Sequence, residues 1–183
     1  MGLRPAVFVD RDGTIMTDRA YLADPVRVEL VPGTLEALAD LQRAGFALVT
    51  VTNQSGIARG LYTECDYLAV AARLAEVLAE GGVVVDRTEF CMHHPAVTGP
   101  CACRKPATGM HLRAAADLRI DPSRSYYVGD KAADVIPAVE LGGQGILVRT
   151  GYGREHEGAV PAGTWIAADL RAAADLILGD RSR

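Results

Sequence analysis

The chain has 183 residues, of which 49% are hydrophobic and 23% charged, and its formal net charge at pH 7 is −4. This length suffices for one domain with a full core, and the hydrophobic content excludes a disordered chain. The negative charge argues against nucleic acid as a default partner, and no apolar run approaches the ~18 residues of a membrane span.

The N-terminus and the cysteines set two further bounds. The segment that precedes the first apolar run, Met1 to Pro5, lacks the apolar stretch of a signal peptide. We therefore expect a cytoplasmic protein without a membrane or nucleic-acid partner, and we expect it to act as a monomer. Three of the four cysteines fall within positions 91–103, a spacing that favours metal binding over a disulfide framework.

The first predicted element is a strand over residues 6–9, a short apolar run typical of a strand buried on both faces of a parallel sheet. Two carboxylates, Asp10 and Asp12, come directly after this strand, and Gly13 and Thr14 follow them. Ligands of open α/β sheets bind at the carboxyl ends of the strands. Two carboxylates there repel each other unless a cation lies between them, so the spacing indicates a Mg²⁺ site with one carboxylate as nucleophile. An ordinary Asp-x-Asp-Gly turn is the alternative.

Further strands and helices are expected along the N-terminal half. They are a functional loop over 15–32, a helix from 32–34 to Gly45, a buried strand over 46–52, a polar loop over 53–60, and a helix from Thr63 to about 81. Thr63 and Asp66 resemble a capping box, although Asp replaces the usual Glu. The apolar face of that helix is predicted to carry Leu68, Ala71, Leu74, Ala75 and Leu78.

The C-terminal half continues the alternation of strands and helices. The expected elements are a strand within 83–90, an irregular segment over 91–105, a helix from 106–108 to 118, a strand over 126–128, a helix over 132–141, a strand over 145–149, a loop over 150–163, an edge strand over 165–167, and a helix from Asp169 to about 178 that ends before Gly179. This order predicts an α/β fold with a mainly parallel sheet and helices on both faces. We expect a single domain over 1–183.

Polar groups lie at or after the carboxyl ends of four of the predicted strands. They are Asp10 and Asp12, Thr52, Lys105, and Asp130. Their order and spacing over residues 6–150 resemble the four motifs of the haloacid dehalogenase (HAD) superfamily of phosphohydrolases. The resemblance implies a Rossmann-like three-layer fold. The lengths between the motifs leave no room for a separate cap domain.

The resemblance also implies a role for each of these residues. Asp10 is the nucleophile that forms an aspartyl-phosphate, and Asp12 is the general acid and then the general base. Asp10, the backbone carbonyl of Asp12, and Asp130 hold Mg²⁺, while Thr52 and Lys105 bind the phosphoryl oxygens. In isolation, Thr52 is also typical of a strand and Lys105 of a solvated surface.

Asp134, four residues after Asp130, either joins the acidic motif or is an ordinary carboxylate on a helix face. The sequence leaves both interpretations open.

A second constellation lies in the cysteine-rich segment. Cys91, His93, Cys101 and Cys103 form the Cys₃His set of a tetrahedral structural Zn²⁺ site. His94 is an alternative fourth ligand, and three buried free cysteines are the alternative to a metal site. Zinc would hold the loop 91–103 just before Arg104 and Lys105. Cys65, in a predicted helix, is expected to be a core residue.

Taken together, the sequences DRDGT at 10–14, TNQSGIARG at 52–60, RKP at 104–106 and GDK at 129–131, with the cysteine-rich loop, resemble the heptose-bisphosphate phosphatase family. Histidinol-phosphate phosphatases share most of these motifs. The implied activity is removal of the 7-phosphate from a heptose bisphosphate, so a phosphosugar is the expected partner. The implied substrate contacts are Asp18, Arg19, Ala20, Tyr21, Asn53, Gln54, Ser55, Arg59, Arg104 and Lys131.

Two alternatives to this activity stay open in the sequence. One is a histidinol-phosphate phosphatase or another phosphatase of small phosphomonoesters. The other is a phosphosugar-binding module without catalysis, against which the complete acidic and lysine motifs argue. Arg59 and Arg104 are the arginines expected to bind the second phosphate of a bisphosphate, because a guanidinium binds phosphate in a directional manner.

Overall fold

The computed structural model describes residues 2–180, so Met1 and residues 181–183, which the predicted domain includes, lie outside the described residues. Six parallel strands form one sheet in the order β3-β2-β1-β4-β5-β6. The strands are β1 (Ala6–Val9), β2 (Ala47–Asn53), β3 (Arg87–Cys91), β4 (Tyr126–Gly129), β5 (Gln144–Val148) and β6 (Trp165–Ala167). The parallel α/β architecture predicted from the order of elements is confirmed.

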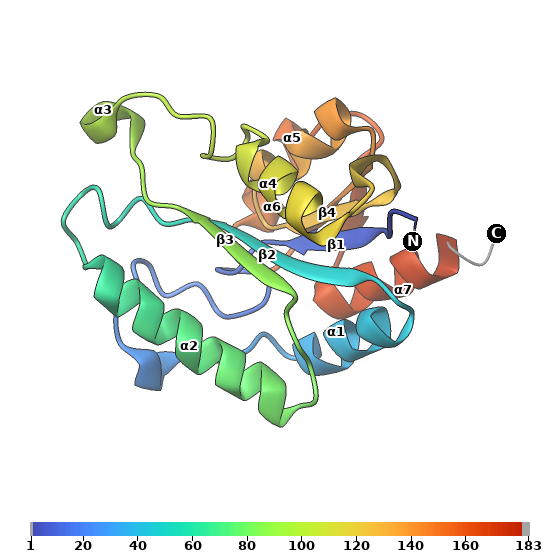
Figure 1. The fold of residues 1–183 in the computed structure, drawn as a ribbon, viewed down its shortest axis with the longest axis horizontal. Helices are drawn as coiled ribbons and strands as arrows, with labels where there is room; N and C mark the ends of the chain where they lie inside the picture. Colours follow the sequence, from blue (N-terminus) through green and yellow to red (C-terminus); the bar gives the residue numbers. More distant parts are fainter. Residues whose placement is uncertain (1, 181–183) are drawn as a thin grey trace.

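Helices cover both faces of the sheet (Figure 1). They are α1 (Thr34–Arg43), α2 (Glu64–Glu80), α3 (Pro95–Thr98), α4 (Gly109–Leu118), α5 (Ala132–Leu141), α6 (Gly153–His156) and α7 (Leu170–Asp180). Short 3₁₀ turns lie at Pro25–Arg27, Pro122–Arg124 and Glu157–Ala159. Within residues 2–180, no helix has both the length and the apolar character needed to cross a membrane.

The central strand β1 is buried on both faces, as its apolar run predicted. Val7 and Val9 pack into the core shared with α1, α2 and α7, whereas Ala6 and Phe8 pack into the core shared with α4. Alternation of side chains along a strand produces this division. A strand enclosed in this way is a rigid base for the residues that follow it.

The carboxyl end of β1 is the point where the strand order reverses. Val9 is paired with Thr50 of β2 on one side and with Val128 of β4 on the other. The backbone of Asp10 extends the contact with β4, because its N–H donates to the Val128 carbonyl at 2.9 Å. Such a switch point is the usual ligand site of an open α/β sheet.

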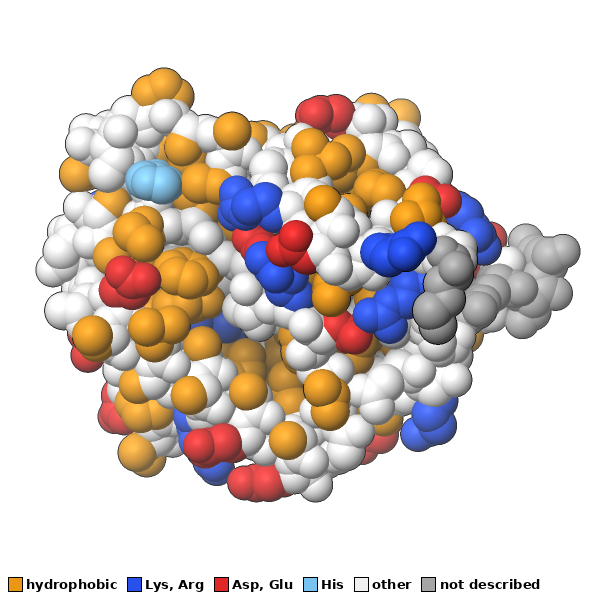
Figure 2. Space-filling model, in the orientation of Figure 1, with side chains coloured by type: hydrophobic (Ala, Val, Ile, Leu, Met, Phe, Trp, Pro, Cys, Tyr) orange, Lys and Arg blue, Asp and Glu red, His pale blue; other side chains and the backbone are white. Residues whose placement is uncertain are grey.

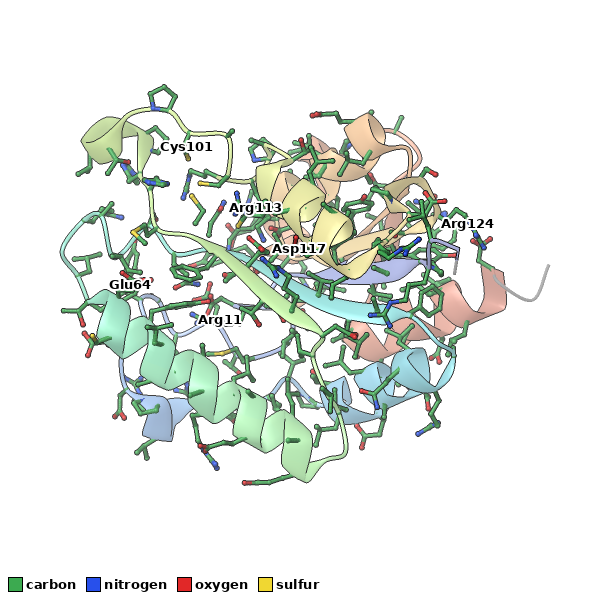
Figure 3. The ribbon with its side chains drawn as sticks, in the orientation of Figure 1. Arg11, Glu64, Cys101, Arg113, Asp117 and Arg124 are labelled. Carbon is green, nitrogen blue, oxygen red and sulfur yellow. The ribbon has the colours of Figure 1, made fainter. Side chains whose placement is uncertain are left out.

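Charged side chains protect the edge strand β3. Glu89 of β3 accepts from Arg87 at 2.6 Å and from Arg113 of α4 at 2.7 Å, and Arg87 also pairs with Asp117 at 2.9 Å. Figure 2 shows basic and acidic groups interleaved on this face, and Figure 3 labels Arg113 and Asp117 there. Charge along an edge strand disfavours pairing with another sheet.

Several local predictions are confirmed. The capping box of Thr63 and Asp66 begins α2, and α5 has the predicted bounds. Gly45 follows α1 with a φ of 84°, a left-handed conformation that glycine adopts without strain. Trp165–Ala167 forms the edge strand β6, and Asp169 Oδ1 accepts from the Ala172 N–H at the start of α7.

Other local predictions are wrong. The buried face of α2 is formed by Tyr67, Val70, Leu74 and Leu78, so Leu68 and Ala75 are exposed, and Cys65 is an exposed residue rather than a core residue. The apolar stripe of α2 runs through Tyr67, Val70 and Leu74. Helical periodicity therefore places Cys65, Leu68 and Ala75 on the solvent-facing side. The helix α7 continues through Gly179, the segment 91–105 contains α3, and the loop 150–163 contains α6.

Candidate active site

Residues from five segments meet at the carboxyl edge of the sheet. Asp10 follows β1, Thr52 is the penultimate residue of β2, Lys105 follows the cysteine-rich segment, Asp130 follows β4, and Asp134 lies in the first turn of α5. All five are buried. The Lys105 ammonium lies 2.6 Å from Asp10 Oδ1 and 2.7 Å from Asp134 Oδ1, and it also donates to the Val51 carbonyl. Lys105 is therefore a buried cation between two carboxylates rather than a solvated surface charge.

Asp134 belongs to this buried cluster, so it joins the acidic motif and is not an ordinary carboxylate on a helix face. Its Oδ2 accepts from the Lys131 N–H at 2.9 Å, while its Oδ1 pairs with Lys105. One carboxylate thus caps the start of α5 and balances the buried lysine.

The carboxylates of Asp10, Asp130 and Asp134 fit a divalent cation. Each offers one oxygen, and these oxygens lie within 4.8 Å of one another. Asp130 Oδ1 is buried without a hydrogen-bond partner among the described residues, whereas its Oδ2 accepts from the Tyr152 N–H at 2.9 Å. Hard carboxylate oxygens are the ligands that Mg²⁺ prefers.

Two glycines permit the approach of Asp130 to the loop after β1. A Cβ built on Gly13 would lie 2.4 Å from Asp130 Oδ2, and one on Gly151 would lie 2.2 Å from it. Both glycines have positive φ, 85° and 53°. Any side chain at either position would displace the Asp130 carboxylate.

The carboxylates repel one another in the absence of a cation. Burial raises the pKa of Asp10 to about 8, with contributions from Asp134, Asp130 and Asp12 that Lys105 partly offsets. Burial likewise raises the pKa of Asp130 to about 6, which Lys131 partly offsets. Burial lowers the pKa of Lys105, but Asp10 and Asp134 outweigh it and the net shift is upward. A bound divalent cation would favour the ionised carboxylates.

A cavity of about 390 Å³ opens above this cluster. The predicted substrate contacts that line it are Asp18, Ala20, Tyr21, Asn53, Gln54, Ser55, Arg104 and Lys131, and Asp12 and Lys105 line it as well. Asp10, Thr52 and Asp130 are not among its lining residues. The loops after β1 and β2 therefore form much of its wall.

Arg19 and Arg59 do not line the cavity, contrary to the expectation for substrate contacts. Arg19 pairs with Glu29 at the surface. Arg59 donates to the hydroxyl of Tyr21, and its guanidinium carbon lies 5.3 Å from the centre of the Tyr21 ring. Arg59 thus holds a residue of the cavity wall. The place of Arg59 in the motif at 52–60 does not reveal this contact.

The sequence analysis missed several lining residues, among them Arg11, Tyr62 and Tyr152. Lys131 Nζ lies 4.7 Å from the centre of the Tyr152 ring, 3.6 Å from Asp18 and 3.5 Å from Asp130. Two further lining residues, Tyr21 and Tyr62, have ring centres 6.4 Å apart. Aromatic residues in loops carry no periodic signal, so only their three-dimensional placement identifies them.

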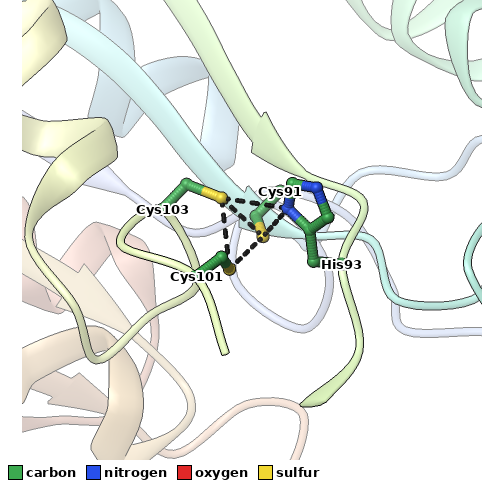
Figure 4. Close-up of side chains that lie close together, drawn as sticks. All are labelled: Cys91, His93, Cys101 and Cys103. Atoms are coloured by element: carbon green, nitrogen blue, oxygen red, sulfur yellow. Dashed lines mark hydrogen bonds between the residues drawn. The ribbon is translucent and has the colours of Figure 1, made fainter. Parts of the chain in front are cut away.

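The four residues of the predicted zinc site lie together (Figure 4). Cys103 Sγ is 3.1 Å from Cys91 Sγ, 3.4 Å from Cys101 Sγ and 3.2 Å from His93 Nδ1, and the four donor atoms lie within 4.8 Å of one another. His94 instead caps α3, where its Nδ1 accepts from the Ala96 N–H at 3.3 Å. The chemistry of this donor set fits a structural Zn²⁺ ion.

The cluster is connected to the cavity by the residue that follows it. Arg104 lines the cavity, and its Nη1 donates to the His93 carbonyl at 3.2 Å. Asn53 joins the next residue to β2, because its Oδ1 accepts from the Lys105 N–H at 3.0 Å and its Nδ2 donates to the Lys105 carbonyl at 3.1 Å. The segment that carries both cations is therefore held on two sides.

Comparison with known proteins gives one consistent family. The HAD-hydrolase-like family model matches residues 102–173. The D-glycero-β-D-manno-heptose-1,7-bisphosphate 7-phosphatases of Yersinia pestis and Escherichia coli K12 are each 42% identical to this chain over 172 residues. Those matches cover 91% of this chain and 91% and 90% of the two relatives.

Solved structures agree with the sequence relatives. A D,D-heptose 1,7-bisphosphate phosphatase from B. bronchiseptica, complexed with magnesium and phosphate, matches with a TM-score of 0.88 and 36% identity, covering 96% of this chain and 99% of that one. The corresponding phosphatase from Burkholderia thailandensis matches with a TM-score of 0.74 and 32% identity over 96% of this chain and 99% of that one. The chain therefore belongs to the D-glycero-β-D-manno-heptose-1,7-bisphosphate 7-phosphatase family of HAD-like hydrolases.

Proposed function

We propose that this chain hydrolyses the 7-phosphate of D-glycero-β-D-manno-heptose 1,7-bisphosphate, with Mg²⁺ as cofactor and an aspartyl-phosphate intermediate. The observation that carries the proposal is the cluster of Asp10, Lys105, Asp130 and Asp134 beside a cavity with cationic walls. Relatives named for this substrate are 42% identical over nearly the whole chain, which supports the choice of sugar.

Asp10 and Asp12 divide the chemistry between them. In the first step, a carboxylate oxygen of Asp10 attacks phosphorus, the bond from phosphorus to the sugar oxygen breaks, and Asp12 gives a proton to that oxygen. In the second step, Asp12 takes a proton from a water molecule whose oxygen attacks phosphorus, and the bond to Asp10 breaks. Proton transfer of this kind contributes typically ~10²–10⁴-fold to the rate.

The remaining residues hold charge and position. Asp10, the backbone carbonyl of Asp12, and Asp130 would hold Mg²⁺, which when bound offsets the repulsion between the phosphate and the nucleophile. Thr52 would donate to the phosphoryl oxygens, and Lys105 would supply a positive charge beside them. Gln54 joins Thr52 to Asp12, because its Nε2 donates to Thr52 Oγ1 at 2.8 Å and to Asp12 Oδ2 at 2.9 Å.

The cysteine-rich loop has a structural role in this proposal. Zn²⁺ bound by Cys91, His93, Cys101 and Cys103 would fix the loop that precedes Arg104 and Lys105. Four protein ligands complete a tetrahedral site, so this ion would have no open position for catalysis. We further propose a single domain without a cap, in which loops at the edge of the sheet supply specificity.

A phosphate-release assay with and without Mg²⁺ tests the proposal. Its substrates are both anomers of the heptose bisphosphate, histidinol phosphate and p-nitrophenyl phosphate. We expect Mg²⁺-dependent release, with the highest kcat/KM for the β anomer. A higher kcat/KM for histidinol phosphate would overturn the assignment of the heptose bisphosphate as substrate. Binding without any phosphate release would indicate a phosphosugar-binding module.

A further inference from the structure

Arg11, the residue between the two aspartates of the first motif, is buried against Asp12. Its side chain is 2% exposed, and Figure 3 places it between the sheet and α2. Nε donates to Asp12 Oδ2 at 3.1 Å and Nη2 donates to Asp12 Oδ1 at 3.0 Å, so the guanidinium binds both carboxylate oxygens. On its other side, the guanidinium carbon lies 5.1 Å from the centre of the Tyr67 ring.

Gln54 forms a second support for the same carboxylate. Its Nε2 donates to Asp12 Oδ2 at 2.9 Å, and its Oε1 accepts from Arg11 Nη2 at 3.2 Å and from the Tyr62 hydroxyl at 2.6 Å. Burial raises the pKa of Tyr62 to about 12, so this hydroxyl stays protonated and can donate. Arg11, Gln54 and Tyr62 thus form a connected network around Asp12.

The network leaves one position on Asp12 for proton transfer. A carboxylate has about four lone-pair positions. Oδ2 accepts two hydrogen bonds, from Arg11 and Gln54, whereas Oδ1 accepts one, from Arg11, among the described residues. Asp12 lines the cavity and its side chain is 20% exposed. The second lone pair of Oδ1 is therefore available to a group in the cavity.

We propose, building on the function proposed above, that Arg11 is a positioning residue that fixes Asp12 so that Oδ1 performs both proton transfers. In the first step the proton on Oδ1 passes to the sugar oxygen as its bond to phosphorus breaks. In the second step Oδ1 takes a proton from the attacking water as the bond from phosphorus to Asp10 breaks. A group held in one orientation reacts faster than one that samples several.

The two steps can be separated with p-nitrophenyl phosphate. The p-nitrophenolate ion leaves without a proton, so formation of the phosphoenzyme needs no help from Asp12, whereas its hydrolysis does. In the Mg²⁺-loaded enzyme, we expect Arg11→Met to release about one p-nitrophenolate per active site in a burst, the signature of an accumulating covalent intermediate. The steady rate should then be ~10²-fold below that of the parent enzyme.

Two further variants complete the test. Arg11→Lys keeps the charge but not the planar fork, so it should show the same burst with a smaller loss of steady rate, ~10-fold. The matched control is Arg73→Met, the same type of substitution on the exposed face of α2. Arg73 pairs with Glu76 at the surface, so this variant should behave like the parent. If Arg11→Met does not fold, Arg11→Lys carries the experiment.

Other outcomes would overturn the inference. Equal slowing of phosphoenzyme formation and hydrolysis would show that Arg11 acts on the fold or on Asp10. A steady rate within threefold of the parent would show that Asp12 needs no such support. Full turnover by an Asp10→Asn variant would instead overturn the covalent mechanism itself, so the two failures are distinguishable.

Discussion

The Lys105 ammonium lies 2.6 Å from the Asp10 carboxylate, although ninety-five residues separate the two in the chain. Both groups are buried, and Asp134 contacts the ammonium from a third segment at 2.7 Å. Lys105 therefore joins the end of β1 to the first turn of α5 and balances part of the negative charge around the proposed nucleophile.

Replacing Lys105 by Met is expected to reduce both stability and activity. Two buried carboxylates would lose their shared cation, and breaking a buried ion pair typically costs ~3–5 kcal/mol. Urea unfolding of the Mg²⁺-loaded variant should show a loss of that size, and turnover should fall by at least ~10²-fold. Parent-like stability would show that the bound cation alone balances Asp10 and Asp134.

Replacing Asp10 by Asn is expected to abolish turnover while the protein stays folded. An amide is a far poorer nucleophile than a carboxylate, and the change keeps the shape of the side chain. Circular dichroism should match that of the parent, and phosphate release should fall to background. Activity within tenfold of the parent would exclude Asp10 as the nucleophile.

The predictable part of the site consists of residues at strand ends. Asp10, Thr52 and Asp130 could be placed because short apolar runs mark the strands, and parallel strands bring their carboxyl ends to one edge. A zinc site could be predicted in the cysteine-rich loop because its ligands are closely spaced in sequence, at Cys91, His93, Cys101 and Cys103. In each case a local pattern determines the position.

The parts that the sequence did not reveal depend on side-chain packing between distant segments. In sequence, Arg11 resembles a spacer between two aspartates, and its partners Gln54 and Tyr67 are separated from it by more than forty residues. Arg59 lies within the motif at 52–60, yet its guanidinium packs on Tyr21 and does not line the cavity. Cys65 is expected in the core because it lies in a predicted helix, but the helix turns that position to solvent.

The zinc proposal predicts about one zinc ion per chain in the purified protein. Thiolates bind the ion, so Cys101→Ser and Cys103→Ser should lower the zinc content measured by mass spectrometry. Cys65→Ser is the matched control, because Cys65 is an exposed cysteine far from the cluster in sequence, and it should retain the ion. Full zinc occupancy in a double Cys91→Ser, Cys101→Ser variant would exclude the site.

The buried ring of His111 should make the folded protein less stable in acid. Its ring in α4 is buried, 5.2 Å from the ring of Phe8 and 5.4 Å from that of Tyr127. Burial lowers its pKa to about 3, with a further contribution from Lys105. The unfolded chain takes up a proton near the ordinary histidine pKa of ~6.5, whereas the folded chain does not, so stability falls as the pH drops from ~6.5 towards 3.

Comparison of the parent with His111→Phe isolates this term. Urea unfolding at pH 7 and at pH 5 gives a loss of stability for each protein, and the loss should be larger in the parent by about 2 kcal/mol. Carboxylates that titrate in the same range contribute equally to both proteins and cancel in the difference. An equal loss in both would show that His111 is protonated in the folded state.

The last prediction concerns the second phosphate of the substrate. Only one end of a bisphosphate can occupy the site at Asp10, so the other end must meet a cation elsewhere. Arg104 lines the cavity, whereas Arg59 is held by Tyr21 outside it. We therefore expect Arg104→Ala to lower kcat/KM for the heptose bisphosphate by ~10²-fold and Arg59→Ala to lower it much less.

The same arginine should matter little for p-nitrophenyl phosphate, which has no second phosphate. Binding energy from the remote end orients the reacting end, so the loss for the bisphosphate should appear in kcat as well as in KM. Zinc content serves as the control, because Arg104 also contacts the His93 carbonyl in the cysteine-rich loop. If Arg104→Ala lowers kcat/KM for both substrates by the same factor, Arg104 acts at the reacting phosphate or in the fold, and the second phosphate is bound elsewhere.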